Sequence, residues 1–368
     1  GSPFFYVKNY YTTHESRIWL RKNKPMTVLP KDVPVPDYFP DLPEVRQGIA
    51  RKYSNIEALD KEVGELLNEL EKDGVLENSI IFFWSDHGGN LLRQKRAVGN
   101  SGLNVPLIIR YPDGFRAGQT DDRMVSLMDL GPTVMSLLGI EPPMYMDGRS
   151  FAGKFEKPPR QYIFGSADRF DESTDMQRSV LDGRYVYIRN FMPELPLIYR
   201  NKYREQITMN KLLIDLNQNG DLQGDASYIF MSKKPIEELY DLNSDPYEVN
   251  NLAKNKDFKY KLLELRQQLE NWQIEVNDRG FTPESNIINE FWPNMIQPIT
   301  SDVSIDISNH VITLNCNTEG ASIGYQTDEK IGTNYWQLYS KPLKLEKIEK
   351  IRARAIRIGY KASRITSN

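Results

Sequence analysis

The chain has 368 residues, and its 47 lysines and arginines against 50 aspartates and glutamates give a formal net charge of −3. This balance excludes a strongly basic nucleic-acid binder. The hydrophobic content of 39% is typical of a folded globular protein, and no run reaches the roughly 18 apolar residues that a membrane span requires. The single cysteine, Cys316, cannot form an intrachain disulfide, so cysteine usage does not indicate the redox compartment.

The first predicted element is a strand over residues 3–11, where aromatic and β-branched residues precede a polar loop. A long helix follows, because apolar residues recur every three or four positions between residues 45 and 70, with Pro43 suited to its start and Gly74 to its end. The apolar runs 80–84 and 105–109 predict strands buried on both faces, as in a parallel sheet. This order favours an α/β layer fold.

The second half of the chain predicts two further parts. Residues 151–160 are basic and proline-rich and indicate a linker, and the strand-like and helical stretches of residues 161–290 indicate a smaller α+β unit. From about residue 297 the sequence alternates with period two, which predicts a small all-β domain. We therefore expect three domains, over residues 1–155, 156–296 and 297–368.

Two of the three histidines, His14 and His87, follow apolar segments. His87 stands beside Asp86 at the end of the run 80–84, and in open α/β sheets functional sites form at the carboxyl ends of strands. A carboxylate next to an imidazole, followed by two glycines that permit a tight turn, is suited to holding an ion. An Asx turn explains the same residues equally well, so both interpretations stay open at this point.

Four segments of the first 151 residues share a recognisable pattern. They read PFFYVKNYYTTHESRIW at 3–19, FFWSDHGGNLLRQKRAVGNSGLNVPLIIRYPDG at 82–114, LMDLGPTVMSLLGI at 127–140 and MDGRSF at 146–151. Together they resemble the carboxyl-terminal half of a formylglycine-dependent sulfatase, most closely the sulfamidase-like branch and its bacterial glycan-degrading relatives. Residues 167–173 and ELYDLNSDPYEVNNLA at 238–253 resemble the small sulfatase subdomain, and the tail from 301 resembles the β domain that ends chitobiases and hexosaminidases.

The resemblance implies an α/β alkaline-phosphatase-like sulfatase layer fold without its amino-terminal part, a small α+β subdomain and a carboxyl-terminal β-sandwich. The implied activity is hydrolysis of a sulfate ester or N-sulfate on a sulfated glycan, in the periplasm or outside the cell. The implied cofactors are one Ca²⁺ ion and a formylglycine nucleophile. Neither a nucleic-acid partner nor a membrane span is expected.

The resemblance also implies roles for particular residues. The catalytic positions, which contact the sulfate or the leaving oxygen, are matched by His14 and Lys95. The calcium ligands are matched by Asp86 and His87. The substrate-facing surface is matched by Arg17, Arg169, Asp171 and Glu172. A mildly acidic protein that binds an anionic glycan needs local positive charge. The cations expected at the pocket are Arg17, Arg93, Lys95, Arg96 and Arg169. Without the resemblance, Lys95 reads as part of a solvated basic run.

Two expected parts of a sulfatase site are absent from this sequence. The Cys/Ser-x-Pro-x-Arg motif that yields formylglycine does not occur, and Cys316 lies in the different context Thr313-Leu314-Asn315-Cys316-Asn317. The paired acidic metal ligands expected near the start of a sulfatase are also missing. We therefore expect the amino-terminal part of the same sulfatase to be a partner that supplies both.

Two other functions compete with this interpretation. A phosphatase or phosphodiesterase of the alkaline-phosphatase-like class shares the sheet, although such enzymes need more histidines than three to hold two transition ions. A non-catalytic glycan-binding module would use the tail domain for recognition. A calcium loop at 215–221 is disfavoured against a plain turn, because Ala226 stands at the twelfth place, where a bidentate carboxylate is needed.

Overall fold

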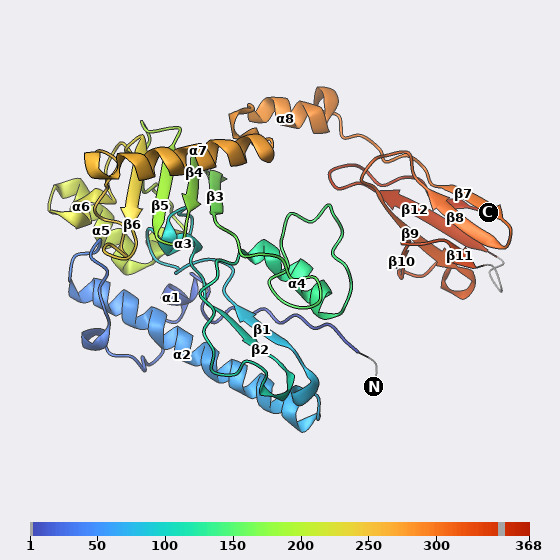
Figure 1. Cartoon of the computed structure of the whole chain (residues 1–368), viewed down its shortest axis with the longest axis horizontal. Helices are drawn as coiled ribbons and strands as arrows, with labels where there is room; N and C mark the ends of the chain where they lie inside the picture. The colour runs from blue at the N-terminus through green and yellow to red at the C-terminus, as the bar shows by residue number, and fades with distance from the viewer. Residues whose placement is uncertain (1–2, 345–349) are drawn as a thin grey trace. The chain divides into compact units, whose positions relative to one another are not determined.

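The computed structural model describes residues 3–344 and 350–368. The chain divides into two compact units, one ending at Asp278 and the other starting at Arg279, which we call unit 1 and unit 2. The expected boundaries after residues 155 and 296 lie inside these units. The helices are α1 Arg17–Leu20, α2 Pro43–Lys72, α3 Asn100–Leu103, α4 Leu130–Leu137, α5 Thr208–Asn219, α6 Asp225–Tyr228, α7 Lys259–Glu275 and α8 Glu284–Phe291 (Figure 1).

The long helix predicted from the apolar stripe is confirmed as α2. Pro43 occupies its first turn, where no intrahelical N–H is needed, and Gly74 follows its end with a positive φ of 68°. Val45 and Ile49 are buried in a core shared with α5 and α6. This core fixes the amino-terminal half of α2, and it also contains Leu91 and Leu92 of the loop that carries the candidate site.

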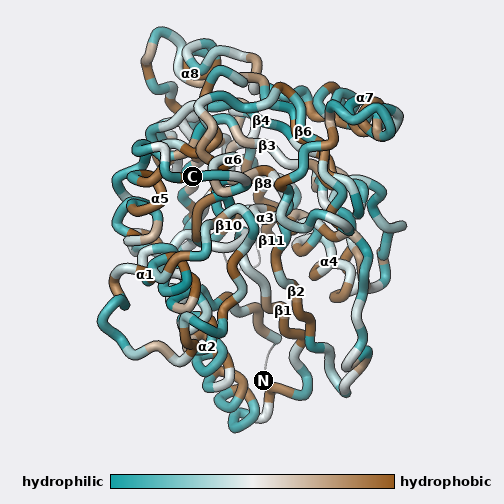
Figure 2. Tube along the Cα trace, turned by 90° about the vertical axis from the view of Figure 1, so that its left-hand side faces the viewer, coloured by the Kyte–Doolittle hydropathy of each residue, from teal (hydrophilic) through white to brown (hydrophobic). Residues whose placement is uncertain are grey.

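The apolar runs 80–84 and 105–109 form strands, but the prediction of a parallel sheet buried on both faces is wrong for the described chain. β1 (Ile81–Trp84) and β2 (Leu107–Arg110) pair antiparallel in a two-stranded sheet and are only partly buried. Figure 2 shows both as hydrophobic segments. Within the described residues neither strand has a second neighbour, so each keeps an open edge.

The strand predicted over residues 3–11 is also wrong. The described residues of this segment have no regular structure, and Phe5 is 77% exposed. An aromatic and β-branched sequence favours a strand only where a neighbouring strand takes its backbone hydrogen bonds, and no strand of the described chain pairs with this segment.

The smaller α+β part predicted after the linker is an antiparallel sheet covered by α7. Its strands follow the order β3-β4-β5-β6, with bounds Ile163–Phe170, Ser173–Leu181, Tyr185–Asn190 and Glu237–Asp241. α7 confirms that residues 161–290 contain a helical stretch, and it lies across one face of the sheet (Figure 1). Its Leu265 packs in a core with Val180 and Tyr187, and the rings of Phe164 and Trp272 stack 4.9 Å apart.

Unit 2 confirms the predicted β-sandwich. Its strands are β7 Ser304–Ser308, β8 Val311–Asn315, β9 Ser322–Thr327, β10 Gln337–Leu338, β11 Leu343–Lys344, β12 Ile351–Ile356 and β13 Thr366–Ser367. They form a sheet in the order β10-β9-β12-β13 and a second in the order β11-β8-β7. Ile312 and Leu314 of one sheet share a buried core with Ala353 and Ala355 of the other.

Two smaller predictions concern helices. Residues 215–219 belong to α5, and Gly220 ends that helix in the left-handed conformation, so the segment is a helix end and turn, as expected, and not a calcium loop. No helix in the described ranges combines the length and the apolar character needed to cross a bilayer.

Candidate functional site

The predicted site loop folds back on itself directly after β1. The backbone N–H of Gly88 donates to the carbonyl of Gly102 at 2.8 Å, and that of Lys95 donates to the carbonyl of Gly89 at 2.8 Å. A Cβ on Gly88 would lie 2.1 Å from the carbonyl oxygen of Ser101, so only glycine permits this approach. The loop therefore has one compact path from Asp86 to the short helix α3.

Asp86 and His87 stand at the start of this loop. The Asp86 side chain is 87% exposed, and its Oδ1 lies 3.7 Å from Nε2 of His87. Nδ1 of His87 lies 2.7 Å from the carbonyl oxygen of Gly88 and must carry the proton there, because a carbonyl only accepts. In the neutral ring this leaves the Nε2 lone pair available to a metal ion.

His14 lies in the turn before α1, with its Nδ1 2.9 Å from the hydroxyl of Ser16 and 3.3 Å from the Ser16 backbone N–H. A backbone N–H only donates, so Nδ1 is the acceptor and Nε2 carries the proton in the neutral ring. Burial lowers the pKa of His14, and the positive charge of Lys95 lowers it further, whereas Glu15 and Asp86 oppose the shift. The structure thus brings His14 within electrostatic reach of Lys95 and Asp86.

Glu15 organises the positive charge of the site. Its side chain is fully buried, and its carboxylate lies 3.1 Å from Arg96, 3.3 Å from Arg204 and 3.9 Å from Lys95. Burial lowers the pKa of Arg204 to about 10, and Glu15 opposes this shift. The second carboxylate of the cluster, Asp171, accepts from Arg96 at 2.9 Å. Three cations therefore share two carboxylates, which leaves excess positive charge.

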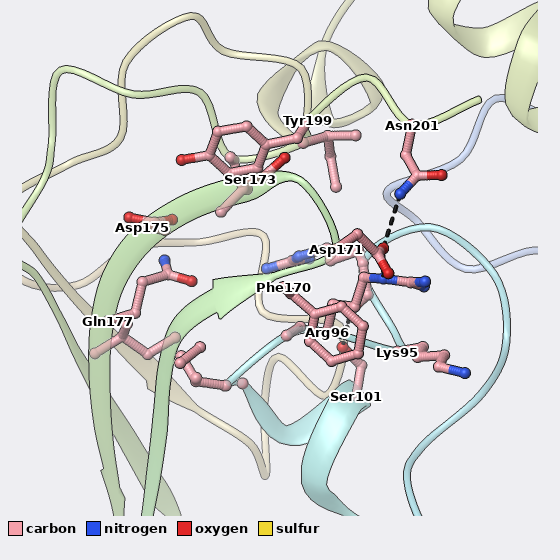
Figure 3. A pocket seen from close by; sticks show the side chains of 18 of the residues that line it. Lys95, Arg96, Ser101, Phe170, Asp171, Ser173, Asp175, Gln177, Tyr199 and Asn201 are labelled. Atoms are coloured by element: carbon pink, nitrogen blue, oxygen red, sulfur yellow. Dashed lines mark hydrogen bonds and ion pairs between the residues drawn. The ribbon is translucent and has the colours of Figure 1, made fainter. Parts of the chain in front are cut away.

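A cavity of about 110 Å³ adjoins this cluster, between the site loop and the strands β3 and β4. Figure 3 shows Lys95, Arg96 and Asp171 on one side of it and Asp175 and Gln177 on the other. The carboxylate of Asp175 is neutralised, because it accepts a hydrogen bond from the fully buried ammonium of Lys234 at 2.7 Å. Asp168 is likewise paired with Arg178 at 2.8 Å. Glu238 and Glu248 also line the cavity and accept hydrogen bonds from neutral groups, among them the Asn190 side chain and the Asn100 backbone N–H. The cations gather on the side of Lys95.

The four expected substrate-facing residues separate into two groups. Arg169 and Asp171 line the cavity, and Asp171 adopts a positive φ of 54° in the β3–β4 turn, where it accepts from Asn201 at 2.7 Å. Glu172 is exposed in the same turn but does not line the cavity, and Arg17 is outside it with its Nε donating to the carbonyl of Tyr11 at 3.3 Å. Their role in substrate binding stays a prediction.

A second buried carboxylate locks the site loop onto the loop after β6. Glu248 accepts the backbone N–H of Asn100 at 2.8 Å, and the guanidinium of Arg93 donates to the carbonyls of Tyr247 and Glu248. Burial raises the pKa of Glu248, and Arg93 opposes that shift. A Cβ on Gly99 would lie 2.8 Å from the Glu248 carboxylate, so this contact also needs glycine. These bonds fix the loop on both sides of Lys95.

The residues at hand do not form a complete calcium site. Calcium takes six to eight oxygen ligands, and within the described ranges no group of three or more histidine, cysteine, aspartate or glutamate side chains could hold an ion. Asp86 supplies a carboxylate and His87 a nitrogen, so the two make a partial ligand set. Cys316 lies in unit 2, where its sulfur donates to the carbonyl of Ser301, and is not part of this site.

Sequence reasoning missed Glu15, Arg204 and Glu248. Each is a charged residue that is almost fully buried, which a sequence does not reveal. Glu15 follows His14 directly, and Glu248 lies in the segment 238–253 that carries the resemblance. Their partners, Arg96 for Glu15 and Asn100 for Glu248, are 81 and 148 residues away along the chain. Only the fold makes these pairs visible.

Residues 1–140 match the family model described as Sulfatase. His14, Asp86 and Lys95 lie within the matched range. The small subdomain and unit 2 lie outside the matched range.

Particular relatives extend the likeness along almost the whole chain. An "Ulvan-active sulfatase" of Formosa agariphila is 40% identical over 99% of this chain and 62% of its own length. The human "N-sulphoglucosamine sulphohydrolase" is 28% identical over 76% of this chain and 58% of its own length. A solved structure of an enzyme with its substrate D-glucosamine-2-N,6-O-disulfate aligns at a TM-score of 0.45 and 23% identity, covering 66% of this chain and 44% of that one. The chain is thus similar to sulfatases along most of its length, and it spans about three fifths of the length of the Formosa agariphila and human relatives.

Proposed function

We propose that this chain is the larger part of an enzyme that hydrolyses sulfate esters, or N-sulfate groups, on a sulfated carbohydrate. The observation that carries the proposal is the placement of Lys95 at the rim of a cavity where three cations share two carboxylates. An anionic sulfate group fits this excess of positive charge. His14, within electrostatic reach of Lys95, adds a hydrogen-bond donor.

The chemistry explains these residue types. Displacement at sulfur develops negative charge on the peripheral oxygens and on the leaving oxygen, and fixed donors in a site shielded from water stabilise that charge best. Lys95 acts as a point charge on the sulfate. The lowered pKa of His14 favours its neutral ring, whose Nε2–H donates a hydrogen bond to the leaving oxygen.

The nucleophile belongs to a segment that this sequence does not contain. In the proposal, the amino-terminal part of the same sulfatase carries the Cys/Ser-x-Pro-x-Arg motif, from which formylglycine forms as the nucleophile, together with the remaining calcium ligands. Asp86 and His87 would hold the ion from this chain's side. Exposed apolar side chains such as Phe5 at 77% and Ile108 at 62% support the idea, because a further segment would cover them.

The substrate class follows from the relatives and from the charge of the site. One relative is named for activity on ulvan and another for N-sulphoglucosamine, so both O-sulfated and N-sulfated carbohydrates are candidates. A periplasmic or extracellular location is part of the same proposal, because sulfated polysaccharides are met there.

Intact mass spectrometry and gel filtration of the natural protein test the proposal first. We expect a polypeptide with the Cys/Ser-x-Pro-x-Arg motif to be joined to this chain or to travel with it, and this complete protein to release sulfate from sulfated saccharides. Lys95→Ala should lower the rate at least about a hundredfold, whereas Lys72→Ala, an exposed lysine at the end of α2, should leave it unchanged. Sulfate release that survives Lys95→Ala would contradict the proposal.

A further inference from the structure

The outer face of one sheet of unit 2 carries an aromatic and cationic surface. β12 alternates strictly: Ile351, Ala353 and Ala355 face the core, so Arg352 and Arg354 face outward. The register places Gln326 of β9 opposite Arg352 and Gly324 opposite Arg354. Residues directly opposite in an antiparallel pair share a face, so these four lie on the outer side of the sheet.

Trp336 lies on this face. A Cβ on Gly324 would lie 3.4 Å from the Trp336 ring, so the ring rests on the bare backbone of this glycine. The guanidinium of Arg352 lies 5.3 Å from the centre of the same ring, within cation–π range. Leu338 of β10, which is 70% exposed, lies opposite Gly324 on the side of β9 away from β12. Ile356, which is 52% exposed, is the last outward-facing residue of β12. The outward face is thus flat and apolar, with two arginines.

The neighbouring loop adds a second aromatic ring and a third cation. Tyr335 is 57% exposed, and the ammonium of Lys330 lies 4.6 Å from its ring centre. The loop is held from beneath by Gln326, which is fully buried and donates to the carbonyls of Thr333 and Tyr335. Gln326 also accepts from Arg352. One buried amide therefore fixes the positions of both the aromatic loop and the arginine.

Charge complementarity identifies the occupant. Within the described part of unit 2, neither Arg352 nor Arg354 forms an ion pair or a hydrogen bond with a carboxylate, and the paired rows of this face contain no acidic residue. Aromatic rings stack on the apolar faces of sugar rings, and guanidinium groups bind sulfate bidentately. We propose that this face, formed by Lys330, Tyr335, Trp336, Leu338, Arg352 and Arg354, is a binding surface for a sulfated polysaccharide, made of other residues than the candidate site of unit 1.

This surface is independent of the proposed hydrolysis, because it needs only binding. The probe is the full chain in affinity electrophoresis or calorimetry with dextran sulfate, with unsulfated dextran as the comparison. We expect binding to dextran sulfate that weakens with added salt, and no measurable binding to dextran. Sulfate release does not enter the measurement, so failure of the catalytic proposal would leave this test intact.

Variants locate the surface. Arg354→Gln changes an exposed side chain and should lower the affinity about tenfold, and combining it with Trp336→Ala should lower it about a hundredfold, since stacking on one aromatic ring accounts for a factor of about 5 to 150. Arg364→Gln, which removes an equal charge from a pair with Asp302, and Tyr260→Ala, which removes an exposed aromatic ring from α7, are the matched controls. Both controls should bind as the unaltered chain does.

Three results would overturn the proposal. The first is unchanged affinity in Arg354→Gln, which does not depend on whether Trp336→Ala folds. The second is an equal loss in Arg364→Gln, which would indicate a general charge effect. The third is equally tight binding of duplex DNA at the same salt concentration, which would show a response to any polyanion and not to a sulfated sugar chain.

Discussion

Replacing Glu15 by glutamine tests the electrostatic core of the site. The substitution keeps the size of the side chain and removes one negative charge that is fully buried among Lys95, Arg96 and Arg204. Removing one partner of a buried ion pair leaves the other charge without compensation, which costs about 3–5 kcal/mol. Here three cations lose a shared partner, and Arg96 alone keeps a second one, Asp171.

We therefore expect Glu15→Gln to lower the free energy of unfolding by about 3–5 kcal/mol. In a domain of this size each kcal/mol shifts the melting temperature by about 2–4 °C, so the expected shift is about 6–20 °C. Circular dichroism during thermal and guanidinium unfolding measures it. The matched control is Glu65→Gln, an exposed residue of α2, which should change the free energy by less than about 0.5 kcal/mol.

A result within about 0.5 kcal/mol of the control would refute this reasoning. It would mean that water or other groups compensate the three cations without Glu15. The excess positive charge at the cavity would then no longer follow from the cluster, and the argument for an anionic ligand would lose its main support.

Three further perturbations have defined outcomes. Gly99→Ala should lower stability by about 1–3 kcal/mol in denaturant unfolding, because its Cβ would displace the buried carboxylate of Glu248, whereas a neutral result would contradict that contact. The hydrogen bond from Arg123 holds the pKa of Asp121 at about 2, below its ordinary 3.8. The ionised Asp121 therefore stabilises the fold above about pH 4, and this stabilisation is lost as the pH falls toward 2. The melting temperature of Arg123→Gln should lack this part of the fall with pH. Leu265→Ala, in the core under α7, should cost about 2–5 kcal/mol, and a smaller loss would show that the helix is not held there.

The sequence predicted those elements whose cause is local. The stripe from Val45 onward makes α2 by itself, and the period-two alternation of residues 351–355 makes β12, with its alanines inward and its arginines outward. Both patterns depend on residues within a few positions of one another. The all-β character of unit 2 followed from the same alternation, whereas its β-sandwich form was implied by the resemblance.

The prediction was wrong where a strand depends on a partner. Residues 3–11 and the runs that form β1 and β2 have strand-like composition, but neighbouring strands decide whether such segments pair and are buried. In the described chain β1 and β2 pair only with each other, and residues 3–11 pair with no strand. The candidate site shows the same limit. His14, Asp86 and Lys95 were named from a resemblance, whereas the buried ion pairs of Glu15 and Glu248 join segments 81 to 148 residues apart and required the fold.

The most direct test of the central claim compares sulfate with phosphate release by the complete natural protein. Ion chromatography measures both anions after incubation with matched sulfated and phosphorylated monosaccharides and with a sulfated polysaccharide. We predict sulfate release that depends on Lys95 and far exceeds phosphate release. Phosphate release that exceeds sulfate release, or no release of either anion by a protein that contains the Cys/Ser-x-Pro-x-Arg motif, would contradict the assignment of this site to sulfate hydrolysis.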